Sequence, residues 1–119
     1  MIPVANGKIP LSAGQVIGSH KSVPITKGNS VVVTSLQIPS SGYKWLVLSR
    51  MDIDFSTTGT MNNELIDDNV IAASSRTIQT NGGGCMAYAI VDPGSFIQAR
   101  CYITAGSGNA SATLQAIRI

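Results

Sequence analysis

The chain has 119 residues and a formal net charge of +2; 44% of its residues are hydrophobic and only 12% are charged. That length predicts a single domain that can bury a core without disulfide or metal staples. The lysines and arginines stand singly along the chain, so the basic patch of a nucleic-acid-binding protein is not expected. No apolar run is long enough to span a bilayer, which argues against membrane insertion.

The low charge has two explanations that the sequence leaves open. Charged residues make up about a quarter of an average soluble protein, roughly twice the share in this chain. A β-rich surface covered by Ser, Thr, Asn and Gln would need few charges. A surface partly buried in an oligomer would also need few, because the cores of interfaces are depleted of charged residues.

The chain begins with a segment unlike the rest. Residues 1–13 contain Pro3, Gly7 and Pro10 among scattered apolar positions, and they are interpreted as an N-terminal arm or linker. Residues 14–119 are interpreted as one domain.

Two strands are predicted in the first part of that domain. Residues 15–20 are expected to form a short strand, which ends at the step from Val23 to Pro24. Residues 30–38 read SVVVTSLQI, a β-branched run bounded by turn residues on both sides. This run predicts a second strand.

The middle of the chain is less regular. Residues 43–55 alternate between an apolar and a mixed face, which predicts a strand that runs from the core toward a sheet edge. Residues 57–69 are rich in Asn and Asp and are predicted to be a long loop. Residues 70–80 are expected to hold one or two short strands, and residues 81–84, NGGG, a flexible break.

Residues 85–119 carry the clearest β signal, with three strand-length segments separated by two turn-rich breaks. Within residues 96–103 the odd positions are apolar and the even ones are mixed, as in a half-buried strand. The whole chain then has seven to eight short strands and no convincing amphipathic helix. This pattern predicts an all-β fold, an antiparallel β-sandwich of the jelly-roll type.

Cys85 and Cys101 are too few for a disulfide framework or a cysteine zinc site. If the Asp-Pro-Gly turn at residues 92–94 joined adjacent strands, Cys85 would face Cys101, and the two could bridge or remain buried thiols. Free thiols are favoured, because free cysteine is among the most buried residue types. In a jelly roll, however, consecutive strands often belong to opposite sheets, and the pairing need not occur.

The candidate catalytic residues are sparse. His20 is the only histidine, and a surface or edge-strand position is favoured for it over catalysis. Asp52 and Asp54 would lie roughly 6–7 Å apart on one strand face, a separation that glycosidase carboxylates can have. Two solvated carboxylates are the favoured interpretation. Neither a catalytic nor a cofactor site is predicted, and the chain is expected not to be an enzyme.

Oxygen-bearing side chains in residues 62–69 could bind Ca²⁺, but their spacing does not match an EF-hand loop, so a polar loop is favoured and no metal site is predicted. Trp45 lies on the apolar face of its strand and is expected in the core. Tyr43, next to Gly42, is the better candidate for an exposed aromatic. The candidate ligand-binding residues are Tyr43, Asn62, Asn63, Asp67 and Asp68.

The C-terminal segments SFIQARCYIT at residues 95–104, GSGN at 106–109 and AIRI at 116–119 resemble the ends of bacteriophage fibre and receptor-binding proteins. The heads of many such proteins are trimeric jelly rolls similar to tumour-necrosis-factor and C1q domains. The resemblance covers mainly residues 85–119, and a weaker similarity extends over residues 43–48. The chain departs from those proteins in having no collagen-like or coiled-coil shaft and few aromatic residues. No binding residue is carried over from them.

The resemblance, the low charge and the β periodicity together give the leading hypothesis, a non-enzymatic module of a phage virion. It would be a fibre head, tail tip or capsid decoration, made in the host cytoplasm and assembled as a homotrimer. Its partner would be a host cell-surface glycan or protein, or a capsid or tail protein. The runner-up is a monomeric carbohydrate-binding module that uses Tyr43. A hydrolase using Asp52 and Asp54 ranks last.

Overall fold

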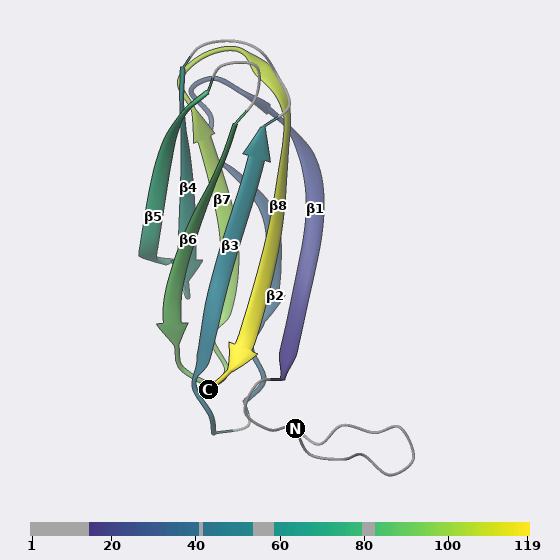
Figure 1. Cartoon of the computed structure of the whole chain (residues 1–119), viewed down its shortest axis with the longest axis vertical. Helices are drawn as coiled ribbons and strands as arrows, with labels where there is room; N and C mark the ends of the chain where they lie inside the picture. Colours follow the sequence, from purple (N-terminus) through teal and green to yellow (C-terminus); the bar gives the residue numbers. More distant parts are fainter. Residues whose placement is uncertain (1–14, 41, 54–58, 80–82) are drawn as a thin grey trace.

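The computed structural model describes residues 15–40, 42–53, 59–79 and 83–119. Within these ranges the chain forms eight strands (Figure 1). No helix in the described ranges is long and apolar enough to cross a membrane. The strands are β1 (Val16–Thr26), β2 (Val31–Gln37), β3 (Trp45–Ile53), β4 (Gly59–Asp67), β5 (Val70–Gln79), β6 (Gly83–Val91), β7 (Phe96–Ile103) and β8 (Ser107–Arg118).

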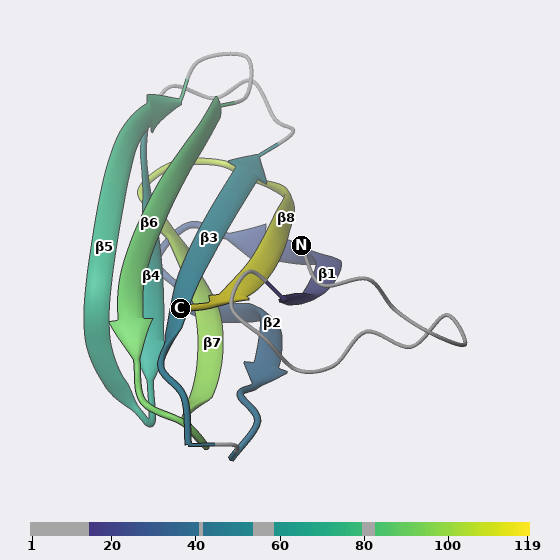
Figure 2. The same cartoon turned by 60° about the horizontal axis from the view of Figure 1, so that its bottom comes forward.

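The strands form two four-stranded antiparallel sheets, ordered β1-β8-β3-β6 and β2-β7-β4-β5. The antiparallel pairs are nested, because β1 pairs with β8, β2 with β7, β3 with β6 and β4 with β5. A long hairpin rolled up on itself gives this order, which is that of an eight-stranded jelly roll. Figure 2 shows the strands enclosing a common interior. The predicted all-β, antiparallel sandwich is confirmed.

The core lies between the two sheets and follows the period-two pattern of the strands. Successive side chains of a strand point to opposite faces, so every second residue points inward. On β7 the four inward residues are fully buried, as the alternation in this segment predicted. On β8 three of the four are alanines. The inward residues of β3, β7 and β8 are Trp45, Val47, Ser49, Met51, Ile53, Ile97, Ala99, Cys101, Ile103, Ala110, Ala112, Leu114 and Ala116.

The first strand is longer than predicted. β1 continues through Pro24 to Thr26 and pairs with β8 along its whole length. β1 is an edge strand, and proline is tolerated there because its missing N–H can face outward without breaking the ladder. The predicted end at the step from Val23 to Pro24 was therefore wrong.

The loop predicted over residues 57–69 is also wrong. Residues 59–67 form β4, which lies inside its sheet and pairs with both β5 and β7. Asn63 faces inward between Met61 and Leu65, and all three are fully buried. The buried asparagine interrupts the apolar face that would have identified the strand. Residues 57 and 58 lie outside the described ranges.

β3 was predicted to run toward a sheet edge. This prediction was wrong, because β3 lies in the middle of its sheet between β8 and β6. Its mixed face, which includes Leu46 and Leu48, is therefore the outer face of that sheet. The prediction of a break at residues 81–84 was wrong for Gly83 and Gly84, which belong to β6. Residues 80–82 lie outside the described ranges, as do residues 1–13 of the predicted arm.

The two cysteines lie in different sheets, Cys85 on β6 beside Met51 and Cys101 on β7 between Val31 and Asn63. The hairpin pairing of Cys85 with Cys101 does not occur, because β6 and β7 are not neighbours in a sheet. Both are free thiols, as the sequence favoured. Burial raises the pKa of Cys85, and it raises the pKa of Cys101 to about 12.

Candidate functional site

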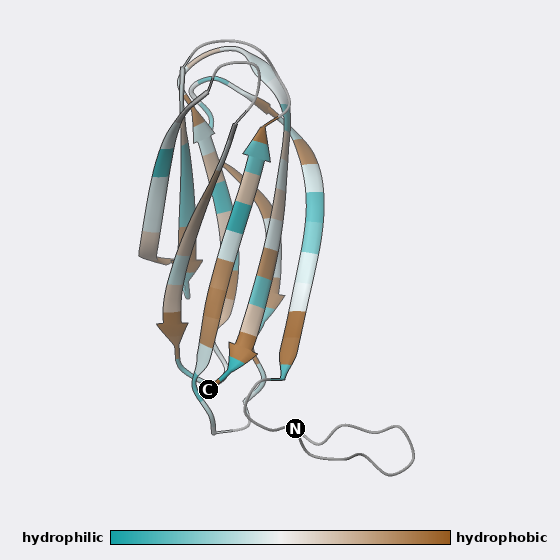
Figure 3. Ribbon diagram, in the orientation of Figure 1, coloured by the Kyte–Doolittle hydropathy of each residue, from teal (hydrophilic) through white to brown (hydrophobic). Residues whose placement is uncertain are grey.

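The outer face of the β1-β8-β3-β6 sheet changes character from one end to the other. In the row nearest the start of β1, all four strands contribute an aliphatic side chain: Val16, Ile117, Leu46 and Ile90. The next row is Gly18, Gln115, Leu48 and Tyr88, and the row after it is His20, Thr113, Arg50 and Met86. Figure 3 shows the same gradient, with brown at the lower ends of these strands and teal further up β3 and β1.

Several of these apolar side chains are open to solvent. Tyr88 is 68% exposed, Ile90 59%, Val16 53% and Met86 53%. The neighbouring aliphatic residues on β3 and β8 are half-buried. We call this surface the apolar face, and it consists of Val16, Leu46, Leu48, Met86, Tyr88, Ile90 and Ile117.

An ion pair lies at each end of the apolar face. At the lower end, Lys44 Nζ is 3.3 Å from Asp92 Oδ1, two residues beyond the row that holds Leu46 and Ile90. At the upper end, Arg50 Nε is 3.5 Å from Asp52 Oδ2. All four side chains are at least half exposed, so the pairs contribute little to stability. What they provide is one cation and one anion at each end.

A shallow groove of about 260 Å³ crosses the upper part of the apolar face. Its lining combines aliphatic, polar and charged groups from three strands, namely Leu48, Arg50, Met86, Thr113 and Gln115. Beside it, His20 Nδ1 lies 2.8 Å from Thr113 Oγ1. The histidine is exposed on an edge strand, as was favoured from the sequence.

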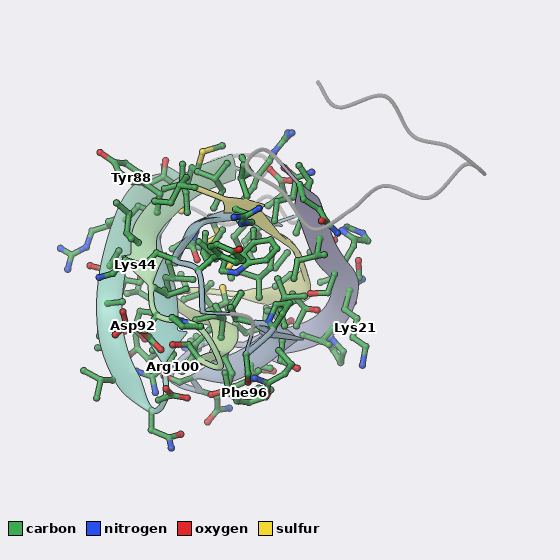
Figure 4. All side chains as sticks on the ribbon, turned by 90° about the horizontal axis from the view of Figure 1, so that it is seen from below. Lys21, Lys44, Tyr88, Asp92, Phe96 and Arg100 are labelled. Carbon is green, nitrogen blue, oxygen red and sulfur yellow. The ribbon has the colours of Figure 1, made fainter. Side chains whose placement is uncertain are left out.

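The other sheet exposes both polar pairs and apolar side chains. Arg100 Nε donates to Glu64 Oε1 at 2.8 Å, and Arg76 Nε donates to Asn62 Oδ1 at 2.9 Å. A hollow of about 250 Å³ is lined by Asn62, Glu64, Ser74, Ser75 and Arg76. The exposed large apolar residues of this sheet are Val70 at 66%, Ile71 at 51%, Val32 at 42% and Phe96 at 40%. Figure 4 shows Phe96 and Tyr88 pointing outward on different sides of the molecule.

The predicted ligand-binding residues occupy several separate places. Tyr43, before β3, is 42% exposed, and the Arg118 guanidinium lies 3.3 Å from its ring centroid. Asn62 lines the polar hollow. Asp67 and Asp68 are neighbours where β4 turns into β5, and Asp68 Oδ1 accepts a hydrogen bond from the backbone N–H of Phe96 at 2.9 Å.

Asn63 has an internal role. Its Nδ2 donates to the backbone carbonyl of Ser49 at 2.9 Å, and its Oδ1 accepts from the Ser49 hydroxyl at 3.1 Å. Both residues are fully buried. The amide therefore joins β4 of one sheet to β3 of the other, and it faces the interior and not a ligand in solution.

The carboxylates considered for catalysis are not gathered in a cleft. Asp52 is paired with Arg50 on the open outer face of β3. Asp54 lies outside the described ranges. Within the described part of the chain, no group of three or more His, Cys, Asp and Glu side chains could hold a metal ion.

The apolar face could have been predicted from the sequence of β6, although it was not predicted from the alternation of polar and apolar residues in the strands. Residues 85–91 of β6 are apolar at every position, CMAYAIV, and not only at every second one. A strand that is apolar on both faces is expected to be covered on both faces. In this chain one side of β6 faces the core, and the other carries Met86, Tyr88 and Ile90 into solvent.

No protein-family model matches the chain, and no curated protein is similar to it in sequence. Solved structures with a similar fold include infectious bursal disease virus strain Gx, at 11% identity and a TM-score of 0.54. The match covers 98% of this chain and 38% of the viral one. The T=1 particles derived from infectious bursal virus match at 11% identity and a TM-score of 0.50, over 98% of this chain and 36% of that one.

A capsid protein of cyanophage Pam1 is 16% identical, with a TM-score of 0.46, over 98% of this chain and 93% of its own. The likeness is one of fold. This chain thus spans well under half the length of the bursal virus chains that it matches.

Proposed function

We propose that this protein is a non-enzymatic structural module of a virion that works as a homotrimer. A fibre head, a tail tip and a capsid decoration are the positions that fit it. The observation that carries the proposal is the apolar face, where neighbouring rows of one sheet leave four apolar side chains more than half exposed. Covering such a face removes apolar area from water, which favours association.

Two further observations support this function. The fold is an eight-stranded jelly roll, and the bursal virus structures with TM-scores of 0.50 and above have a similar fold. The surface is poor in charge, with 12% charged residues in the chain, as expected where part of the surface is covered by other subunits.

In this proposal the second sheet contacts the host receptor or a neighbouring capsid or tail protein. The polar hollow around Asn62 offers hydrogen-bonding groups on that sheet, and Asp67 and Asp68 lie at one of its turns. Tyr43 adds an aromatic ring beside Arg118 near the C-terminus. Asn63 is excluded from this contact because its amide is used inside the core.

The alternative function is a monomeric carbohydrate-binding module. Aromatic rings bind sugars through an open face, and the Arg118 guanidinium already lies over one face of Tyr43. The alternative predicts glycan binding by the monomer that is lost in Tyr43→Ala. The absence of glycan binding at millimolar concentration would reject it.

Immunogold electron microscopy tests the proposed function directly. An antibody raised against the purified protein should label virus particles from the source culture at a fixed position, either on fibres, at the tail tip or over the capsid. Label confined to cells, or particles that carry no label, would contradict a role in the virion.

A further inference from the structure

We infer that the apolar face of the β1-β8-β3-β6 sheet is the surface on which a second copy of this chain docks. The inference deepens the oligomeric part of the proposed function and rests on it. It names the subunit contact, with Tyr88 and Ile90 of β6 at its centre and the groove beside Leu48 as the hollow that receives side chains of the other copy.

The exposed area suits a subunit contact. Burying one aromatic side chain removes about 150–250 Å² from water. Tyr88 at 68% exposure and three aliphatic or thioether side chains above half exposure therefore leave several hundred Å² open in one continuous patch. The largest apolar patch on an ordinary monomer covers about 300–600 Å² and is often functional.

The charges around the apolar face favour a copy of this chain over a strongly charged partner. Each end of the face carries one cation and one anion, so neither end has a net charge that would attract an acidic or a basic surface. When copies stand side by side in parallel, the same rows meet at the same level. Lys44 of one copy can then pair with Asp92 of the next, and Arg50 with Asp52, without like-charge repulsion.

Sedimentation velocity of the full chain over a concentration series, with two variants, tests this inference. Tyr88→Lys places a charge at the centre of the apolar face and should weaken self-association by at least about 30-fold, as expected for a hot-spot aromatic. Val32→Lys is the matched control, because Val32 is also exposed, at 42%, on an edge strand, but of the other sheet. It should associate like the wild type. Circular dichroism and a thermal melt verify that each variant is folded, and Tyr88→Ser replaces Tyr88→Lys if the lysine variant is not.

The outcomes separate the two proposals. Wild-type oligomers that persist in both Tyr88 variants would overturn the docking surface and leave an oligomeric module intact. A wild type that is monomeric at all concentrations would overturn both. A monomeric full chain that oligomerises when residues 1–14 are removed would show that this segment, and not a second copy, covers the face, and would also overturn the inference. Association that is lost in Tyr88→Lys and kept in Val32→Lys supports it.

Discussion

Asn63 is a polar side chain enclosed between the two sheets, with its shorter hydrogen bonds to Ser49 and a longer one, at 3.5 Å, to the backbone carbonyl of Cys85. Its amide donates to the Ser49 carbonyl and accepts from the Ser49 hydroxyl. A buried polar group is tolerated only when its hydrogen bonds are made, so the two residues depend on each other. The pair also fixes the register of β4 against β3 across the core, because only one alignment brings the amide to Ser49.

Replacing Asn63 with alanine should therefore destabilise the fold by about 2–4 kcal/mol, since it leaves Ser49 unpaired and opens a cavity. Urea unfolding of the wild type and the variant measures the difference. Asn62→Ala is the control, because the neighbouring asparagine points to the outer face. Its cost should stay within about 0.5 kcal/mol, as for other surface changes. Equal costs for the two variants would contradict the role of the buried pair.

Because of the buried thiol of Cys101, we expect the folded state to lose stability at alkaline pH. Burial raises the pKa of this thiol from its ordinary value of 9.0 to about 12, so the folded state disfavours the thiolate. The unfolded chain releases the proton at lower pH than the folded chain does. The contribution of the thiol to stability is therefore complete below pH 9 and falls as the pH rises from 9 toward 12.

Urea unfolding between pH 8 and pH 11 measures this loss, and Cys101→Ala is the matched variant because it removes the titrating group. The decline above pH 9 should be shallower in the variant than in the wild type. The same slope in both proteins would show that Cys101 does not contribute to it.

At the scale of single strands, the outer face of the first sheet contains two glycines that differ in what surrounds them. A Cβ on Gly18 of β1 would lie 2.8 Å from the backbone carbonyl oxygen of Leu114. A Cβ on Gly84 of β6 would first meet the carboxylate tip of Asp52, which can rotate away. The backbone of β8 cannot move without breaking its pairing on both sides.

Gly18→Ala should thus cost about 1–3 kcal/mol, the usual range for overpacking, and Gly84→Ala clearly less. Thermal unfolding of the two variants gives the comparison. A larger loss in Gly84→Ala than in Gly18→Ala would show that the backbone of β8 gives way more easily than the Asp52 side chain.

The strands that could be predicted from the sequence are those with an unbroken apolar alternation. β7 was predicted over the residues it occupies, and Trp45 of β3 was predicted to lie in the core. In each of these strands one face is clearly more apolar than the other. β4 was missed because Asn63 stands where the pattern requires an apolar residue. The end of β1 was missed because the sequence does not reveal which strands lie at an edge, where Pro24 is tolerated.

The candidate site was less predictable than the fold. The polar residues chosen from the sequence were assumed to share one loop, and the structure distributes them over a strand interior, a sheet surface and a turn. The apolar face depends on four strands that are distant in sequence and adjacent only in the sheet. Its residues become a single surface only when the strand order is known.

At the scale of the whole molecule, the two outer faces of the jelly roll differ in composition. The β2-β7-β4-β5 sheet carries paired polar groups together with exposed Val70 and Ile71 at one end of β5. The β1-β8-β3-β6 face exposes apolar groups that stay in water if the chain is alone. Covering such a face removes apolar area from water, which is the main driving force of association.

If the protein works as a homotrimer, as proposed, the mass of the wild-type chain in solution shows it directly. Light scattering behind a sizing column, over a hundredfold range of dilutions, should give three times the chain mass of 12.4 kDa at every concentration. A mass of one chain throughout the series would contradict the account, because the apolar face would then be stable in water without a partner.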